Sequence, residues 1–111
     1  DNEVVFKQVI EMPFPFKNRE VVQYCKTTFL TNGIIRLDLK EQNDATPPND
    51  DYVRMPLSRG YWILKPQNGG TFVEYSFLAD PSGNIPAWLA NQFIVDSPFK
   101  TITALRKFLA N

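Results

Sequence analysis

Histidine is absent from the sequence, cysteine occurs once, and acidic and basic residues are equal in number, with twelve of each. Without histidine the chain lacks the commonest general base and the commonest metal ligand. The single Cys25 excludes an internal disulfide and a zinc site built from several thiolates. The charge balance leaves no electrostatic attraction to nucleic acid. No apolar run exceeds four residues, so no segment of this sequence is long enough to span a membrane.

The chain is short and rich in phenylalanine and proline. The chain has 111 residues, of which 43% are hydrophobic and 22% charged, as is ordinary for one small globular domain. Nine phenylalanines and nine prolines are the unusual counts. Many aromatic side chains without histidine favour packing or an apolar cavity over bond-making chemistry. The sequence also lacks a glycine-rich phosphate loop, a serine elbow and a closely spaced carboxylate pair.

Alternating, β-branched residues predict an antiparallel sheet of five or six strands. The strongest hairpin signal is Asn32-Gly33, because both residues tolerate positive φ. A second hairpin turn is expected at 67–70, and residues 80–83 (DPSG) fit a type I turn. The sequence does not decide whether one bent strand or two occupies residues 52–65. The predicted strand segments are 3–11, 20–31, 34–40, 52–55, 61–65 and 71–78.

The end of the chain changes to a helical period. Apolar residues recur every seven positions at Trp88, Val95, Ile102 and Leu109, with Phe99 on the same stripe. This spacing predicts an amphipathic helix over residues 85–110 whose stripe faces the sheet. Asn84 is a candidate cap for it.

Pro98 lies inside the predicted helix and removes one helical hydrogen bond. Because the apolar stripe keeps its phase across Pro98, the sequence favours one long helix with a kink. The alternative is that Asp96 or Ser97 caps a second, separate helix starting at Pro98.

Arginines within predicted strands are the first candidate site residues. An arginine is costly to bury unless it is paired. Arg19 and Arg54 therefore either line a cavity and meet the polar head of a ligand, or are structural residues that are exposed or ion-paired. Cys25 is interpreted as a small buried hydrophobe, because no histidine is available to activate it.

Acidic and aromatic residues give weaker signals. The aspartates at 44, 50 and 51 lack the regular spacing of a calcium loop. We therefore predict no metal site and no cofactor. Six aromatic residues are candidates either for the core or for the lining of a cavity: Phe72, Tyr75, Phe77, Trp88, Phe93 and Phe99.

Three segments in series resemble motifs of the START domain, the lipid-carrying family related to steroidogenic acute regulatory protein. Residues 13–22 (PFPFKNREVV) are similar to the family's P-x-P-x-x-N-R-D-x-V stretch, with Glu20 where aspartate is usual. Residues 52–66 resemble G-V-I-R followed by W-x-I-x-P. Residues 80–91 (DPSGNIPAWLAN) resemble D-P-x-G-x-I-P-x-W-L-x-N. The resemblance covers nearly the whole chain.

This resemblance implies an α+β helix-grip fold, in which a curved antiparallel sheet packs on a long C-terminal helix around a lipid-sized tunnel. START domains are longer than this chain. Residues 1–111 are therefore expected to form the C-terminal half of a single domain, with the N-terminal helix and first strands absent. The apolar edge left at 3–11 predicts self-association, most simply as a two-fold dimer.

The function implied by the resemblance is non-catalytic binding, and transfer, of a lipid or other hydrophobic ligand. Cys25 stands where sterol-carrying branches have a further buried arginine, so the ligand stays open. The loop at 43–51 would lie beside the tunnel mouth. The expected ligand-binding residues are Arg19, Val21, Gln23, Cys25, Arg54, Tyr75, Phe77, Trp88, Val95 and Phe99.

Two other functions are weighed against this one. Helix-grip proteins include cyclases and aromatases that act on polyketides, and the absence of histidine counts against that activity here. A pure interaction module is the weakest hypothesis, because nothing resembles a peptide groove. The partners expected are a hydrophobic small molecule and transient contact with a membrane, with no nucleic acid.

Overall fold

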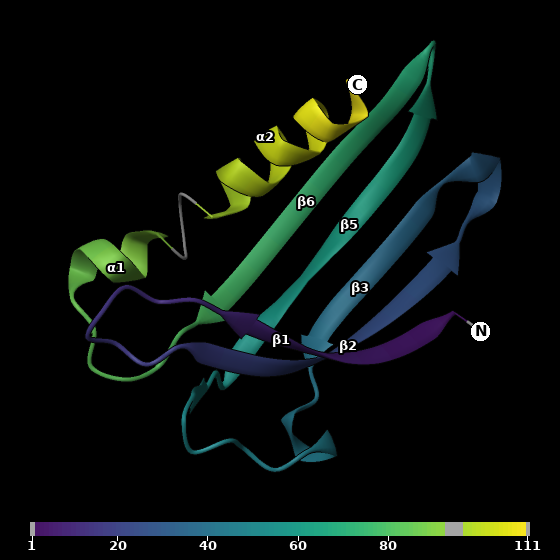
Figure 1. The fold of residues 1–111 in the computed structure, drawn as a ribbon. Helices are drawn as coiled ribbons and strands as arrows, with labels where there is room; N and C mark the ends of the chain where they lie inside the picture. Colours follow the sequence, from purple (N-terminus) through teal and green to yellow (C-terminus); the bar gives the residue numbers. More distant parts are fainter. Residues whose placement is uncertain (1, 93–96, 111) are drawn as a thin grey trace.

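The computed structural model describes residues 2–92 and 97–110 of the chain. It has an α+β fold in which one open sheet carries two helices along one side (Figure 1). The Cα radius of gyration is 15.8 Å, whereas a compact domain of this length has about 13 Å. The chain is therefore less compact than a typical domain of its length. Its strands are β1 (Glu3–Ile10), β2 (Arg19–Phe29), β3 (Ile35–Glu41), β4 (Val53–Arg54), β5 (Leu57–Gln67) and β6 (Gly70–Asp80), and its helices are α1 (Ala87–Asn91) and α2 (Ser97–Leu109).

The sheet has the strand order β1-β2-β3-β5-β6, and these neighbours are antiparallel. The two-residue β4 pairs in parallel with the start of β2. Residues 52–65, where the sequence did not decide between one bent strand and two, therefore contain two strands, β4 and the first part of β5. The predicted edge at the N-terminus is confirmed, because β1 pairs only with β2 within the described residues.

Both predicted hairpins are present. Asn32 and Gly33 have φ values of 61° and 75° in the link between β2 and β3, as expected for this pair. Gln67 pairs with Gly70 at the β5–β6 hairpin. The prediction of a type I turn at 80–83 was wrong. Ser82 has φ of 63°, whereas the third residue of a type I turn has φ near −90°.

The single long helix predicted over residues 85–110 was also wrong. The structure has a five-residue α1 and a thirteen-residue α2 that begins at Ser97, which agrees with the alternative of a separate second helix. Pro98 then falls in the first turn, where its missing N–H costs nothing. Asn84 is no cap, since Pro86 precedes α1 and no side chain bonds its first turn.

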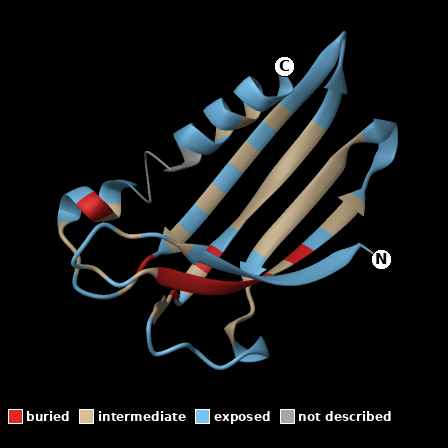
Figure 2. Cartoon of the chain, in the orientation of Figure 1, coloured by how far each residue is buried: buried red, intermediate tan, exposed pale blue. Residues whose placement is uncertain are grey.

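Burial is concentrated at one end of the sheet (Figure 2). The small core consists of Val21 and Met55, with Ile10, Met12 and Ala79 packed against it. Leu89 of α1 is also buried. Most of α2 and the far part of β6 remain exposed or half-buried in Figure 2. The chain thus has a closed end near α1 and a far end where apolar residues are only partly covered.

Candidate functional site: a groove between the sheet and the last helix

A groove of about 810 Å³ lies between the far end of the sheet and α2. This volume is within the range of about 300–1,000 Å³ that is usual for small-molecule sites. Strands β3, β5 and β6 form its floor, and α2 forms one wall. Its lining residues are Leu37, Trp62, Leu64, Gln67, Thr71, Phe72, Val73, Ile102, Leu105, Arg106 and Leu109.

The strand register explains why the floor is apolar. Leu37 is opposite Trp62, and Leu64 is opposite Val73. Since side chains alternate across a sheet, these four residues project from the same face. The other face is more polar: it carries Arg36, Asp38 and Glu74, and there the Tyr61 hydroxyl donates to Glu74 at 2.6 Å. The apolar floor therefore follows from the alternation in the sequence.

Helix α2 supplies the apolar wall with residues spaced three, four and seven apart. Ile102, Leu105 and Leu109 line the groove, and this spacing places them on one side of a helix. The predicted stripe was only partly right: it contained Ile102 and Leu109 but not Leu105, which also lines the groove. Of the predicted stripe, Ile102 and Leu109 line the groove, whereas Trp88 in α1 and Phe99 in α2 are exposed.

Trp62 begins an aromatic row that continues from the groove toward the buried end. Its ring stacks on Tyr75 with centroids 4.2 Å apart, and Tyr75 stacks on Phe77 with centroids 6.2 Å apart. Burial raises the pKa of the Tyr75 hydroxyl. Tyr75 and Phe77, both predicted as ligand-binding residues, thus extend the apolar face beyond the groove without lining it.

Arg19 was expected to border the cavity, and the structure instead places it against a turn. It is 3% exposed, and its guanidinium donates to the carbonyl oxygens of Pro81 at 3.0 Å, Ser82 at 2.8 Å and Lys17 at 2.6 Å. Burial lowers its pKa. Gly83 has a φ of 79°, which favours glycine, and a Cβ there would also lie 2.7 Å from the same guanidinium. Through these hydrogen bonds Arg19 links β2 to residues 81–82, which lie between β6 and α1.

Arg54 takes part in a buried ion-pair network at the start of β2. Its Nε donates to Glu20 at 3.0 Å, and Lys7 approaches the other oxygen of Glu20 at 3.1 Å. Glu20 is fully buried, which alone would raise its pKa, but hydrogen bonds from the Asn49 backbone, Lys7 and Arg54 outweigh burial and lower it. Arg54 is therefore the ion-paired structural residue of the two alternatives.

The same network holds the loop at 43–51. Arg54 donates to the carbonyl oxygens of Asn43, Thr46 and Pro47, and the Asn49 backbone donates to Glu20 at 2.9 Å. No residue of this loop lines the groove. The structure therefore places it at the start of β2 and not at the mouth of the groove.

Three further predicted residues, Val21, Gln23 and Cys25, alternate along β2 and are buried. The Gln23 amide donates to the carbonyl and the hydroxyl oxygen of Ser58, both at 2.9 Å. Burial raises the pKa of the Cys25 thiol, with a smaller contribution from Asp38. Cys25 is thus a buried neutral thiol, as interpreted from the sequence, and these residues lie outside the groove.

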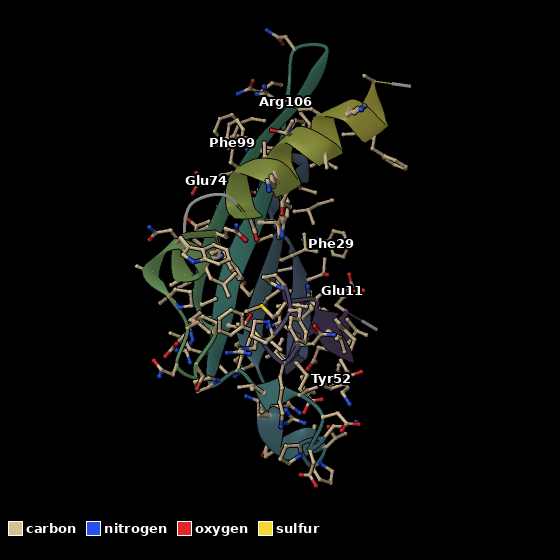
Figure 3. The ribbon with its side chains drawn as sticks, turned by 60° about the vertical axis from the view of Figure 1, so that its left-hand side comes forward. Glu11, Phe29, Tyr52, Glu74, Phe99 and Arg106 are labelled. Carbon is tan, nitrogen blue, oxygen red and sulfur yellow. The ribbon has the colours of Figure 1, made fainter. Side chains whose placement is uncertain are left out.

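The expectation that Trp88 and Phe99 face the sheet was wrong for this chain. Trp88 is 55% exposed and Phe99 is 73% exposed. Leu89, the neighbour of Trp88, is the residue that α1 buries. Figure 3 shows Phe99 and Arg106 toward opposite ends of α2. Val95 lies outside the described residues.

Sequence reasoning missed most of the groove. Trp62, Leu64 and Val73 are at alternate positions of predicted strands, so their common face could have been recognised from the pattern. Leu105 could not have been recognised from the sequence, because whether it faces the groove depends on where α2 starts. Within the described residues no cluster of three or more carboxylate, thiol or imidazole groups could hold a metal, and no helix is long and apolar enough to cross a membrane.

Curated relatives were found in bacteria and mammals. The chain is 38% identical over 98 residues to an uncharacterised protein of Pseudomonas aeruginosa, PA1579, covering 87% of this chain and 48% of that protein. It is 27% identical over 96 residues to START domain-containing protein 10 of Mus musculus and of Homo sapiens, covering 86% of this chain and 32% of each. The chain thus spans about a third to a half of these relatives. No family model matches it.

Two crystal structures share the fold. A STAR-related lipid transfer protein fragment from Xanthomonas axonopodis superposes with a TM-score of 0.87 at 35% identity, covering all of this chain and 63% of that one. Human STARD10 superposes with a TM-score of 0.70 at 24% identity, covering 96% of this chain and 42% of that one, and supports the fold alone. From this fold and these relatives, the chain belongs to the START (STAR-related lipid transfer) family, whose matched members it spans only in part.

Proposed function

We propose that the chain binds a lipid or another hydrophobic ligand in the groove between the sheet and α2, without catalysing a reaction. The observation that carries this proposal is the groove itself, with apolar side chains from three strands and one helix around about 810 Å³. The similarity to a protein named for lipid transfer supports the same class of ligand. Transfer between membranes would be an activity of the whole protein.

Energetics favour an alkyl chain in such a groove. Each methylene removed from water contributes about 0.8 kcal/mol, so a chain of a few carbons contributes several kcal/mol. Among the described lining residues the polar side chains are those of Gln67, Thr71 and Arg106. The described lining residues include no carboxylate, thiol or imidazole, the groups that most often serve as general acids and bases. The lining thus supports binding and gives no support to the cyclase or aromatase alternative.

The first test compares two leucine-sized positions on opposite faces of β5. We expect Leu64→Asn to weaken binding of the neutral apolar dye Nile red about tenfold or more, because burial of a leucine side chain contributes about 1.5–3 kcal/mol. Ile63→Asn is the matched control, since Ile63 alternates with the lining residues and does not line the groove. Fluorescence titration measures both, with circular dichroism as the check on folding.

Two results would argue against the groove as the binding site. One is an equal loss of affinity in both variants, and the other is the absence of dye binding by the parent chain. Mass spectrometry of lipids that co-purify with the full natural protein addresses the ligand itself. A recovered lipid supports the proposal, whereas turnover of a polyketide would support the enzyme alternative.

We also propose that this chain self-associates through β1. Its apolar residues Val4, Val5, Phe6 and Val9 are 39–52% exposed, and β1 has an unpaired outer edge in the described structure. Such an edge is a template for pairing with another strand. A second copy of the chain would pair with it in a two-fold dimer that buries more than about 1,000 Å².

Light scattering at micromolar concentration tests this assembly. We expect the parent chain to be a dimer and Val5→Lys to be a monomer, because a lysine on an edge strand disfavours pairing. Leu78→Lys on the other edge strand, β6, is the control. A monomeric parent chain would refute self-association. A dimer disrupted only by Leu78→Lys would refute the assignment to β1.

A further inference from the structure

We propose that the groove takes a long-chain amphiphile with an anionic headgroup, and that Arg106 binds this headgroup. The inference rests on the proposed function and specifies the class of ligand. Arg106 is the one charged residue among the described lining residues, whereas neither aspartate nor glutamate is among them. The groove therefore combines apolar walls with a single positive charge.

The positive charge of Arg106 is not compensated within the described part of the chain. Three carboxylates of the strands that form the floor have other partners, and none of them lines the groove: Glu41 pairs with Arg59, Asp38 with Arg36, and Glu74 accepts from Tyr61. No ion pair joins Arg106 to a described carboxylate. A guanidinium without an internal partner remains available for an anion from solution.

The polar lining residues gather at one end of the groove. Gln67 and Thr71 flank the tip of the β5–β6 hairpin, where Pro66 is opposite Thr71. Arg106 is in the last turn of α2, and the C-terminal end of α2 lies beside this tip (Figures 1 and 3). Leu37 and Trp62 line the groove on the inner strands. The polar lining residues thus lie together at the hairpin end, beside Phe72 and Leu109, while the lining residues of the inner strands away from this tip are apolar.

Arginine suits carboxylate and phosphate groups equally well. Its planar guanidinium can donate two parallel hydrogen bonds to either, and hydrogen bonds to charged groups are stronger than neutral ones. Gln67 and Thr71 add an amide and a hydroxyl that can donate to the same headgroup. A fatty carboxylate and an alkyl phosphate share this chemistry, whereas a fatty alcohol of the same length lacks the charge.

A structural role for Arg106 predicts a different outcome. A cation in the last turn also offsets the negative end of the helix dipole. Lys107 is in the same turn, carries the same charge, and does not line the groove. Lys107→Gln therefore removes an equal charge from the same helix end and is the matched control for Arg106→Gln.

The experiment uses three ligands with one twelve-carbon chain: dodecanoic acid, dodecyl phosphate and dodecanol. Trp62 lines the groove and is one of two tryptophans, so Trp88→Phe makes its fluorescence the only tryptophan signal. We expect at least one of the two anions to bind about tenfold more tightly than the alcohol. Arg106→Gln should abolish this preference and retain alcohol binding, while Lys107→Gln should keep the preference.

Each outcome decides the inference. A preference for the carboxylate alone, or for the phosphate alone, supports it and identifies the headgroup. Equal binding of all three ligands, or a preference that survives Arg106→Gln, overturns it and leaves the proposed function standing. Loss of the preference in Lys107→Gln as well also overturns it, because the charge would then act through the helix. Failure of every ligand to bind would overturn the proposed function itself.

Discussion

Replacement of Glu20 by alanine should destabilise the chain by about 3–5 kcal/mol, the usual cost of leaving a buried ion pair without one partner. The Glu20 carboxylate is fully buried and contacts Arg54, whose side chain is 12% exposed. Its removal also takes the acceptor from the Asn49 backbone. Lys7 is more exposed and can return to water, so it contributes less to the cost. Urea unfolding monitored by circular dichroism measures the change.

Two variants make the Glu20 experiment specific. Asp38→Ala removes the acidic partner of Arg36 in a partly exposed pair and should cost about 1 kcal/mol or less. Glu20→Gln keeps the volume and an acceptor but removes the charge, so an intermediate loss is expected. If Glu20→Ala were no worse than Asp38→Ala, the network at the start of β2 would contribute little to stability.

The same network predicts how stability depends on pH. The pKa of Glu20 is lowered in the folded chain from its ordinary value of 4.5. Its contribution to stability is therefore present above pH 4.5 and is lost as the pH falls through the folded-state pKa. The pKa of Glu41 is lowered too, where Arg59 and the Ser58 backbone outweigh burial. Glu20→Gln should therefore reduce the acid dependence of unfolding without abolishing it.

Gly60→Ala should be nearly as damaging, with an expected loss of about 3 kcal/mol or more. A Cβ at residue 60 would overlap the Ser76 carbonyl oxygen and lie 3.1 Å from the Cα of Phe77. Both atoms belong to the backbone of β6, directly across the ladder from Gly60. They cannot move aside as a flexible side chain can, so the β5–β6 pairing must distort.

Gly70→Ala is the control for Gly60→Ala. It lies in the neighbouring strand, has no heavy atom within 4 Å of an added Cβ, and has no positive φ. Its effect should stay within about 0.5 kcal/mol. Equal unfolding midpoints for the two variants would show that β5 and β6 are spaced more widely than the structure indicates.

The strands could be predicted from the sequence because their signals are local. Asn32-Gly33 sets a hairpin through its own backbone preferences, and alternating residues such as Leu37 and Leu39 define a face. The floor of the groove follows from the same alternation. Family resemblance supplied the fold, which the superposition on the Xanthomonas axonopodis structure confirms.

The helices and the arginines could not be predicted in the same way. A seven-residue stripe is compatible with one helix or two, and only tertiary packing decides that Leu89 is buried while Trp88 is exposed. Arg19 bonds carbonyl oxygens more than sixty residues away. Nothing local marks those acceptors, so its place in the strand alone was compatible with either a cavity role or a structural role.

The uneven burial along the sheet separates a fixed end from an adaptable one. Near β2, the side chains of Arg19, Gln23 and Arg54 donate hydrogen bonds to specific acceptors. Because hydrogen bonds weaken steeply when their angle changes, this end of the sheet tolerates little movement. Around the groove, the walls are mostly aliphatic and aromatic side chains, whose contacts have no preferred direction. If the groove binds hydrophobic ligands as proposed, ligands of different width would be accommodated by small shifts of these side chains. The register of the strands at the other end would stay the same.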